Sequence, residues 1–102
     1  MAEAAAARDI GTIAAMLDRG DDPNARRYVR APLIDGVAVE MTPLEAGVAA
    51  GRLEVVHLLT TRGAALDDRR RVALACEALH RGYKDVAEFL AGAVTAARLC
   101  NP

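Results

Sequence analysis

Three carboxylates and a histidine are the residues of this 102-residue chain whose types could do chemistry. Glu77 and His80 are three residues apart in a largely apolar segment, so on a helix they share one face. A half-buried carboxylate with a raised pKa beside an imidazole is a conceivable acid–base pair, and Glu45 and Glu40 are the other carboxylates that such a site would use. The simpler interpretation is that Glu77 is exposed, that His80 is a contact residue and that the chain has no catalytic residue.

Cys76 and Cys100 are the two cysteines of the chain. Small domains that depend on disulfides carry many more cysteines, and neither residue has the paired spacing of a zinc site. We therefore expect both thiols to be reduced, with Cys76 buried and Cys100 in a tail. This interpretation predicts a cytoplasmic location, no bound metal and no cofactor.

Alanine dominates the composition, which limits the elements that can position these residues. The chain has 23 alanines and three aromatic residues, so a core must be built from Ala, Leu, Val and Ile. Such small side chains suit helices that lie very close together in thin layers. The net charge of −1 argues against non-specific binding of nucleic acid. No apolar stretch of about 18 residues indicates a membrane span, and the first residues do not have the pattern of a secretory signal.

Three segments of the chain align with one another, and each places an acidic residue before apolar residues at helical spacing. A shorter, alanine-rich helix is expected before each of them. The three aligned segments are residues 8–20, 51–63 and 82–90, and the preceding helices are expected at residues 2–7, 42–50 and 72–81.

The turn between the two helices of each unit contains Arg8, Gly51 or Gly82. Glycine is expected at this position because helices often end on a residue with positive φ. Arg8 departs from this pattern. We expect either that Arg8 adopts a strained, positive φ or that its turn has a different geometry.

The middle unit carries a family resemblance. Residues 42–47 read Thr-Pro-Leu-Glu-Ala-Gly, and residues 51–59 read Gly-Arg-Leu-Glu-Val-Val-His-Leu-Leu. This pattern resembles the ankyrin repeat, which opens with T-P-L-H-x-A, although Glu45 stands in place of the histidine and Gly47 in place of the alanine. Thr42 can cap a helix, and Pro43 suits the first helical position because no N–H is needed there. The resemblance extends from residue 2 to about residue 93.

The resemblance implies an all-α fold: an ankyrin-type α-solenoid of about three helix-turn-helix repeats, with an elongated β-hairpin inserted between repeats 1 and 2. Residues 1–102 then form a single domain. The expected boundaries are about 2–24 for repeat 1, 25–41 for the hairpin, 42–68 for repeat 2, and 69–102 for repeat 3 with a C-terminal cap.

The hairpin is expected because the first interval between units is about 10 residues longer than the family period predicts. Asp35-Gly36 is a signal for a two-residue turn, and β-branched residues flank it. Pro32 must then lie at an edge or at an unpaired site. One face of this hairpin is too apolar to remain in water, so the molecule itself, a partner or another copy of the chain should cover it.

Ankyrin-like stacks usually bind partners through their finger tips and the face of their first helices. The resemblance therefore implies a non-catalytic protein–protein interaction module: an adaptor, a regulator or an inhibitor. Arginines at the edge of this face favour a partner with an acidic segment, and the hairpin favours an apolar one. Alternatively, residues 67–71 are a self-neutralising surface turn. The expected partner-binding residues are Tyr28, Leu33, Ile34, Val39, Met41, Ala49, Ala50, Arg69, Arg70, Val72, His80 and Arg81.

Two other functions remain open at this point. In the first, the hairpin closes over an apolar groove that binds a small molecule, and Glu77, His80, Glu45 and Glu40 are the candidate catalytic residues. A closed cavity with buried carboxylates favours this function, whereas an open groove with a solvated Glu77 argues against it. In the second, the chain forms a homo-oligomer through the hairpin.

Overall fold

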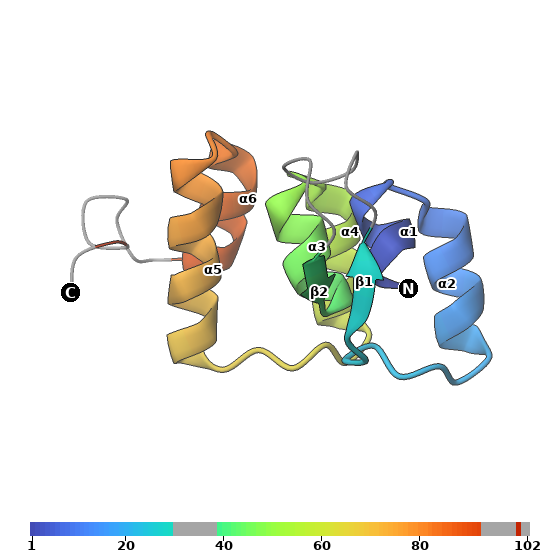
Figure 1. Ribbon diagram of the computed structural model, residues 1–102. Coiled ribbons are helices and arrows are strands. Elements are labelled where there is room, and N and C mark those ends of the chain that lie inside the picture. Colours follow the sequence, from blue (N-terminus) through green and yellow to red (C-terminus); the bar gives the residue numbers. More distant parts are fainter. Residues whose placement is uncertain (30–38, 93–99, 101–102) are drawn as a thin grey trace.

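The structure is a computed structural model that describes residues 1–29, 39–92 and 100 (Figure 1). The described chain is mostly helical and has one small antiparallel sheet, which confirms this part of the expected fold. The elements are α1 (Ala2–Ala6), α2 (Ile10–Asp18), β1 (Arg27–Val29), β2 (Val39–Met41), α3 (Pro43–Ala49), α4 (Leu53–Thr61), α5 (Asp68–His80) and α6 (Lys84–Ala91).

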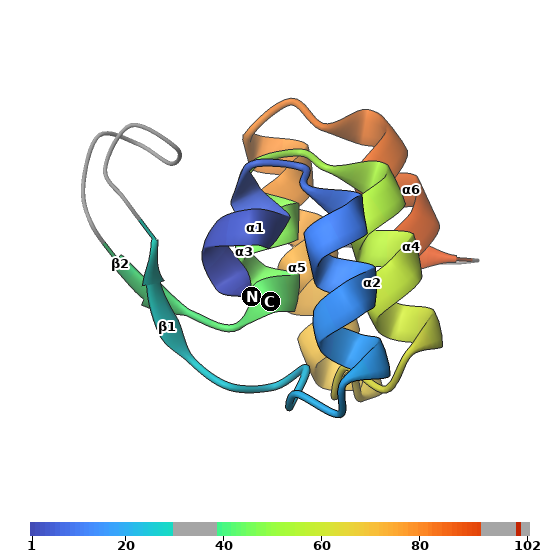
Figure 2. The same cartoon turned by 90° about the vertical axis from the view of Figure 1, so that its right-hand side faces the viewer.

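The helices form two rows. The first helices of the three pairs, α1, α3 and α5, lie side by side, and α2, α4 and α6 form a second row behind them (Figures 1 and 2). Strands β1 and β2 lie on the outer side of the first row, away from the second row (Figure 2). Strand β1 contacts α1 directly, so the hairpin base is part of the packed structure.

Small side chains allow the first row to pack closely. Ala2, Ala5 and Ala6 of α1 are fully buried, and this helix contacts α2, α3 and β1. Larger aliphatic side chains fill the remaining interior, and each of them is at most 1% exposed. They are Ile13, Val29, Val48, Val55, Val56, Leu59, Val86 and Leu90.

The turns within the three helix pairs share one hydrogen-bond pattern. In the second pair, the N–H of Gly51 donates to the carbonyl of Val48, and the N–H of Arg52 donates to that of Gly47. The turns at Arg8 and Gly82 repeat this pattern, and all three turn residues have positive φ, between 60° and 86°. Arg8 therefore adopts the same strained turn as the two glycines.

Side chains cap the starts of α3 and α5. Thr42 accepts a hydrogen bond from the N–H of Glu45, and Glu45 accepts one from the N–H of Thr42, so the sequence pattern here forms a complete capping box. Helix α5 begins at Asp68 rather than near residue 72, because the carboxylate of Asp67 accepts the N–H of Arg70. Residues 68–71 form the first turn of α5 rather than a turn in a loop, and Arg71 pairs with Asp68 at 2.8 Å, so the self-neutralising pairing of the alternative prediction is present.

The strands β1 and β2 pair in a register that places Val29 opposite Val39. The predicted turn itself falls within residues 30–38, which are outside the described residues, as are residues 93–99 of the predicted C-terminal extension.

None of the helices in the described ranges combines the length and the apolar character that crossing a membrane requires.

Replacing Gly51 with alanine should destabilise the protein more than the same change at Gly82. Both residues have positive φ, which costs an alanine about 1 kcal/mol. A Cβ atom at Gly51 would also lie 2.7 Å from the ring of Tyr83, whereas nothing lies within 4 Å of a Cβ at Gly82. We expect the free energy of unfolding in urea to fall by about 1 kcal/mol for Gly82→Ala and by about 2–4 kcal/mol for Gly51→Ala.

Truncating the ring provides the control for this comparison. In a Tyr83→Ala background, the extra cost of Gly51→Ala should disappear, leaving about the cost of the strained φ. Equal losses for Gly51→Ala with and without the Tyr83 ring would contradict the close approach of this turn to the third helix pair.

Candidate functional site

One carboxylate joins the base of the hairpin to two helices. Glu45 lies in the first turn of α3, and its Oε1 atom is 3.0 Å from Nη1 of Arg26 in the segment that leads into β1. Its Oε2 atom is 3.2 Å from Nη2 of Arg70 on α5. The same carboxylate accepts the N–H of Thr42 at 2.8 Å. Glu45 thus connects the hairpin, the capping box and the third helix pair.

Arg26 extends this cluster to the second strand. Its Nη2 atom donates to the backbone carbonyl of Glu40 at 2.9 Å, and its Nε atom lies 3.5 Å from the Glu40 carboxylate. A surface pocket of about 530 Å³ lies beside the cluster. Its lining residues are Asn24, Arg26, Thr42, Ala65, Leu66, Asp67 and Arg70.

The surroundings of Glu45 stabilise its ionised form. Burial acts to raise the pKa of this carboxyl and is the largest single influence. The hydrogen bond from the Thr42 N–H and the guanidinium groups of Arg26 and Arg70 act in the opposite direction, and together they hold the pKa of Glu45 below its ordinary value. Glu45 is therefore an anion at neutral pH, which suits a structural ion pair better than a proton donor.

The outer face of the hairpin presents an aromatic side chain to solvent. Tyr28 is 69% exposed, while its neighbour Val29 points inward and is 1% exposed. Glu40 lies opposite Tyr28 and is also exposed. Arg69, in the first turn of α5, is exposed and makes no hydrogen bond or ion pair within the described part of the chain. Tyr28 and Arg69 are therefore predicted partner-binding residues that a partner can reach.

The other predicted partner-binding residues are less accessible or lie outside the described residues. Ala49 is buried, and Arg70 is paired with Glu45. Met41, Ala50, Val72 and Arg81 are half-buried, and His80 is exposed. Leu33, Ile34 and the side chain of Val39 are outside the described residues.

The predicted acid–base pair is not assembled. Glu77 has an ion pair with Arg81, at 3.4 Å, and its side chain is 41% exposed. The imidazole of His80 lies instead against Cys76. No hydrogen bond joins Glu77 to His80 among the described residues, and no polar or charged side chain is buried in the part that the structure describes.

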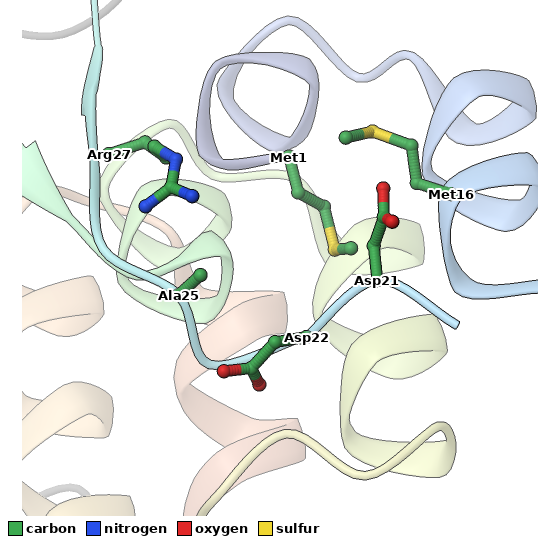
Figure 3. Close-up of a pocket in the computed structure, with 6 residues that line it drawn as sticks. All are labelled: Met1, Met16, Asp21, Asp22, Ala25 and Arg27. Carbon is green, nitrogen blue, oxygen red and sulfur yellow. The ribbon is translucent and has the colours of Figure 1, made fainter. Parts of the chain in front are cut away.

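A second pocket, of about 240 Å³, lies between α2 and the segment that leads into β1 (Figure 3). The thioethers of Met1 and Met16 and the carboxylate of Asp21 lie on one side of it, and Arg27 lies on the other (Figure 3). Asp22 and Ala25 complete the lining. Sequence reasoning did not identify this pocket, because only the fold brings Met1, Met16 and the segment before β1 together.

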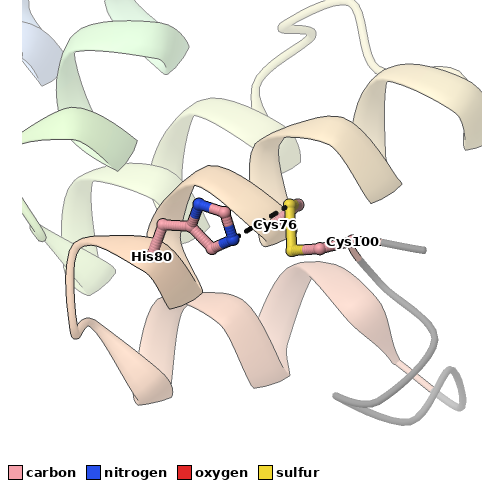
Figure 4. Close-up of a disulfide and its surroundings, with 3 residues drawn as sticks. All are labelled: Cys76, His80 and Cys100. Atoms are coloured by element: carbon pink, nitrogen blue, oxygen red, sulfur yellow. Dashed lines mark hydrogen bonds between the residues drawn. A yellow bond between two sulfur atoms is a disulfide. The ribbon is translucent and has the colours of Figure 1, made fainter. Parts of the chain in front are cut away.

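The two cysteines form a disulfide, so the prediction of reduced thiols is wrong for this structure (Figure 4). The Cα atoms of Cys76 and Cys100 are 5.1 Å apart, within the range that a disulfide spans. Cys76 is half-buried rather than buried. The Sγ atom of Cys76 also lies 4.0 Å from Nε2 of His80. The proximity of Cys76 and His80 could have been predicted from the sequence, since these residues are four positions apart and share a helix face.

Comparison of the chain with protein-family models, with curated proteins and with solved structures gives no match.

Neutralising Glu45 should weaken the protein at neutral pH and have a smaller effect in acid. Glu45→Gln keeps an acceptor for the Thr42 N–H and removes the charge that pairs with Arg26 and Arg70. We expect a loss of about 1 kcal/mol in the free energy of unfolding at pH 7. Because the folded pKa is lowered, this stabilisation is complete above the ordinary pKa of a glutamate and disappears as the pH falls through the folded pKa.

The measurement is urea unfolding of the wild type and the variant at pH 7 and near pH 3. Glu40→Gln is the matched control, because Glu40 pairs with no arginine other than Arg26 among the described residues and is more exposed; it should lose less than Glu45→Gln. A difference between Glu45→Gln and the wild type that stays the same in acid would show that the charge of Glu45 is not responsible.

Proposed function

We propose that the chain is an ankyrin-type solenoid of three repeats and that it is a protein–protein interaction module without catalytic activity. The observation that carries this proposal is the arrangement of three consecutive helix pairs in two rows, with the same turn geometry in each pair. The capping box at Thr42 supports it as well, because it gives the Thr-Pro pair of the family pattern a structural role.

Polar links between neighbouring pairs also support a stacked arrangement. Asn24, in the loop after α2, accepts the N–H of Ala65 at 2.6 Å and donates to the carbonyl of Gly63 at 3.4 Å, in the loop after α4. Arg52 donates to the carbonyl of Ala6 at 3.1 Å and thereby links α4 to α1. Equivalent loops of successive units are thus joined, as expected where each unit packs on the next.

The binding face is proposed to be the outer side of the first row, where the hairpin lies. Tyr28 offers an exposed aromatic ring, and Arg69 offers a guanidinium group with no partner among the described residues. Tyrosine and arginine are the residue types most enriched among those that contribute strongly to binding energy. The chemistry favours a partner segment with both a carboxylate and an apolar side chain.

The alternative function, an enzyme with the hairpin as a lid, has less support from the structure. Such a site needs a buried carboxylate beside a closed cavity. Within residues 1–29 and 39–92 no carboxylate is buried, and Glu77 is ion-paired and partly solvated. The observations on Tyr28 and Arg69 give more support to the interaction module.

Replacing both side chains should weaken capture of the partner. The Tyr28→Ser/Arg69→Glu variant removes the aromatic ring and reverses the charge, and both sites are exposed, so the fold should survive. We expect proteins that the wild type captures saturably from an extract of its source cells to bind at least about ten-fold more weakly to this variant. The measurement is affinity capture, followed by titration of each captured protein against the purified chain.

The matched control is Glu88→Arg, an exposed charge reversal on α6 in the second row. It should capture the same proteins as the wild type. Retention of every partner by the Tyr28→Ser/Arg69→Glu variant, or loss of the partners from the control, would place the binding face elsewhere. A wild type that captures nothing saturably would count against the interaction function itself.

A further inference from the structure

We propose that Cys76, His80 and Cys100 form a redox-gated site for a soft divalent metal ion, with Zn²⁺ as the best fit. The oxidised chain holds Cys76 and Cys100 as a disulfide, and the reduced chain offers two thiolates and an imidazole to the metal. This site goes beyond the interaction function and does not depend on it.

The three side chains already converge at one point (Figure 4). Their potential ligand atoms all lie within 4.8 Å of one another. Cys76 and His80 are four residues apart on α5, so the helix itself holds the sulfur and the imidazole on one face. The Nε2 atom of His80 is 4.0 Å from the sulfur of Cys76.

The observed spacing is close to what a zinc ion requires. Zn–S bonds of about 2.3 Å and Zn–N bonds of about 2.0 Å in a tetrahedron place sulfur about 3.5 Å from nitrogen and two sulfurs about 3.8 Å apart. The Cys76–His80 pair therefore needs to close by about 0.5 Å. The two sulfurs must separate, which reduction of the disulfide permits.

The ligand set is one that zinc accepts. Two cysteines and one histidine, with water in the fourth position, are a known ligand set for this ion. His80 is exposed and has no other hydrogen bond among the described residues, so its imidazole is available. The neighbouring carboxylate of Glu77 is directed to Arg81.

Reduction and metal binding are two separate steps. A dithiol reductant transfers two electrons and two protons to the Cys76–Cys100 bond, which gives two thiols and the cyclic disulfide of the reductant. Zn²⁺ then displaces the two thiol protons into solvent and binds the thiolates and the neutral imidazole. The disulfide and the metal-bound form exclude each other, because the same two sulfurs take part in both.

Co²⁺ replaces Zn²⁺ as a spectroscopic probe in the test. The full chain is reduced with a phosphine, which takes up an oxygen atom from water to form its oxide as the disulfide opens. We expect one equivalent of Co²⁺ to give a thiolate-to-cobalt charge-transfer band and the visible bands of a tetrahedral ion. Zn²⁺ should then displace the cobalt. The oxidised chain should give neither signal.

Variants identify the ligands. His80→Asn should weaken Co²⁺ binding at least about ten-fold, since even loss of a residue that only orients a ligand has an effect of that size. Cys100→Ser should weaken binding further, and this residue lies outside the helices, so circular dichroism should show an unchanged helical fold. His57→Asn is the matched control, because His57 is the other histidine of the chain and packs against Phe89 on the far row.

Absence of the charge-transfer band in the reduced wild type would overturn the proposal. Equal binding by the oxidised and reduced chains would overturn the gating. Equal affinities for the wild type and His80→Asn, or an equal loss in His57→Asn, would remove His80 from the site.

Discussion

The close approach of neighbouring helices is the constraint on which the rest of the structure depends. The buried face of α1 consists of alanines, and a Cβ atom at Gly47 of α3 would lie 3.1 Å from Val55 of α4. Close packing buries these helices well, but small side chains remove little apolar surface from water per residue. The stabilisation is correspondingly small, because it scales with the apolar area that is buried. Further contacts between successive pairs must therefore add to this apolar packing. Polar links such as the hydrogen bonds of Asn24 to the loop after α4 supply part of them.

The same constraint explains how the hairpin is attached. Val29 is the only residue of β1 that enters the core, so the strand has few apolar contacts of its own. Glu45 compensates by holding Arg26 at the base of the hairpin and Arg70 on α5 with one carboxylate. A residue that sequence reasoning considered for proton transfer thus has a structural role. Its ionisation is favoured by the same arginines that it positions, so the charge of Glu45 and the attachment of the hairpin depend on each other.

Local patterns in the sequence predicted what local physics determines. Apolar spacing identified α2, α4 and α6, and the alanine-rich segments before them indicated α1, α3 and α5. The Thr42-Pro43 pair identified the start of α3. Contacts between distant residues left no such signal. Arg26 and Arg70 meet Glu45 from 19 and 25 residues away. The pairing of Cys76 with Cys100 depends equally on where the chain returns, which spacing alone does not encode.

The cysteine pair and the hairpin lie in different parts of the molecule. Cys76 belongs to α5 in the terminal helix pair, whereas β1 packs on α1 near the other end of the first row (Figure 1). His80 is the residue at which the two proposed functions meet, because it is both a predicted partner-binding residue and a neighbour of Cys76. An imidazole whose Nε2 atom binds a metal ion cannot also accept a hydrogen bond from a partner. Tyr28 and Arg69 have no contact with the disulfide among the described residues, so a partner that binds through them is compatible with either redox state.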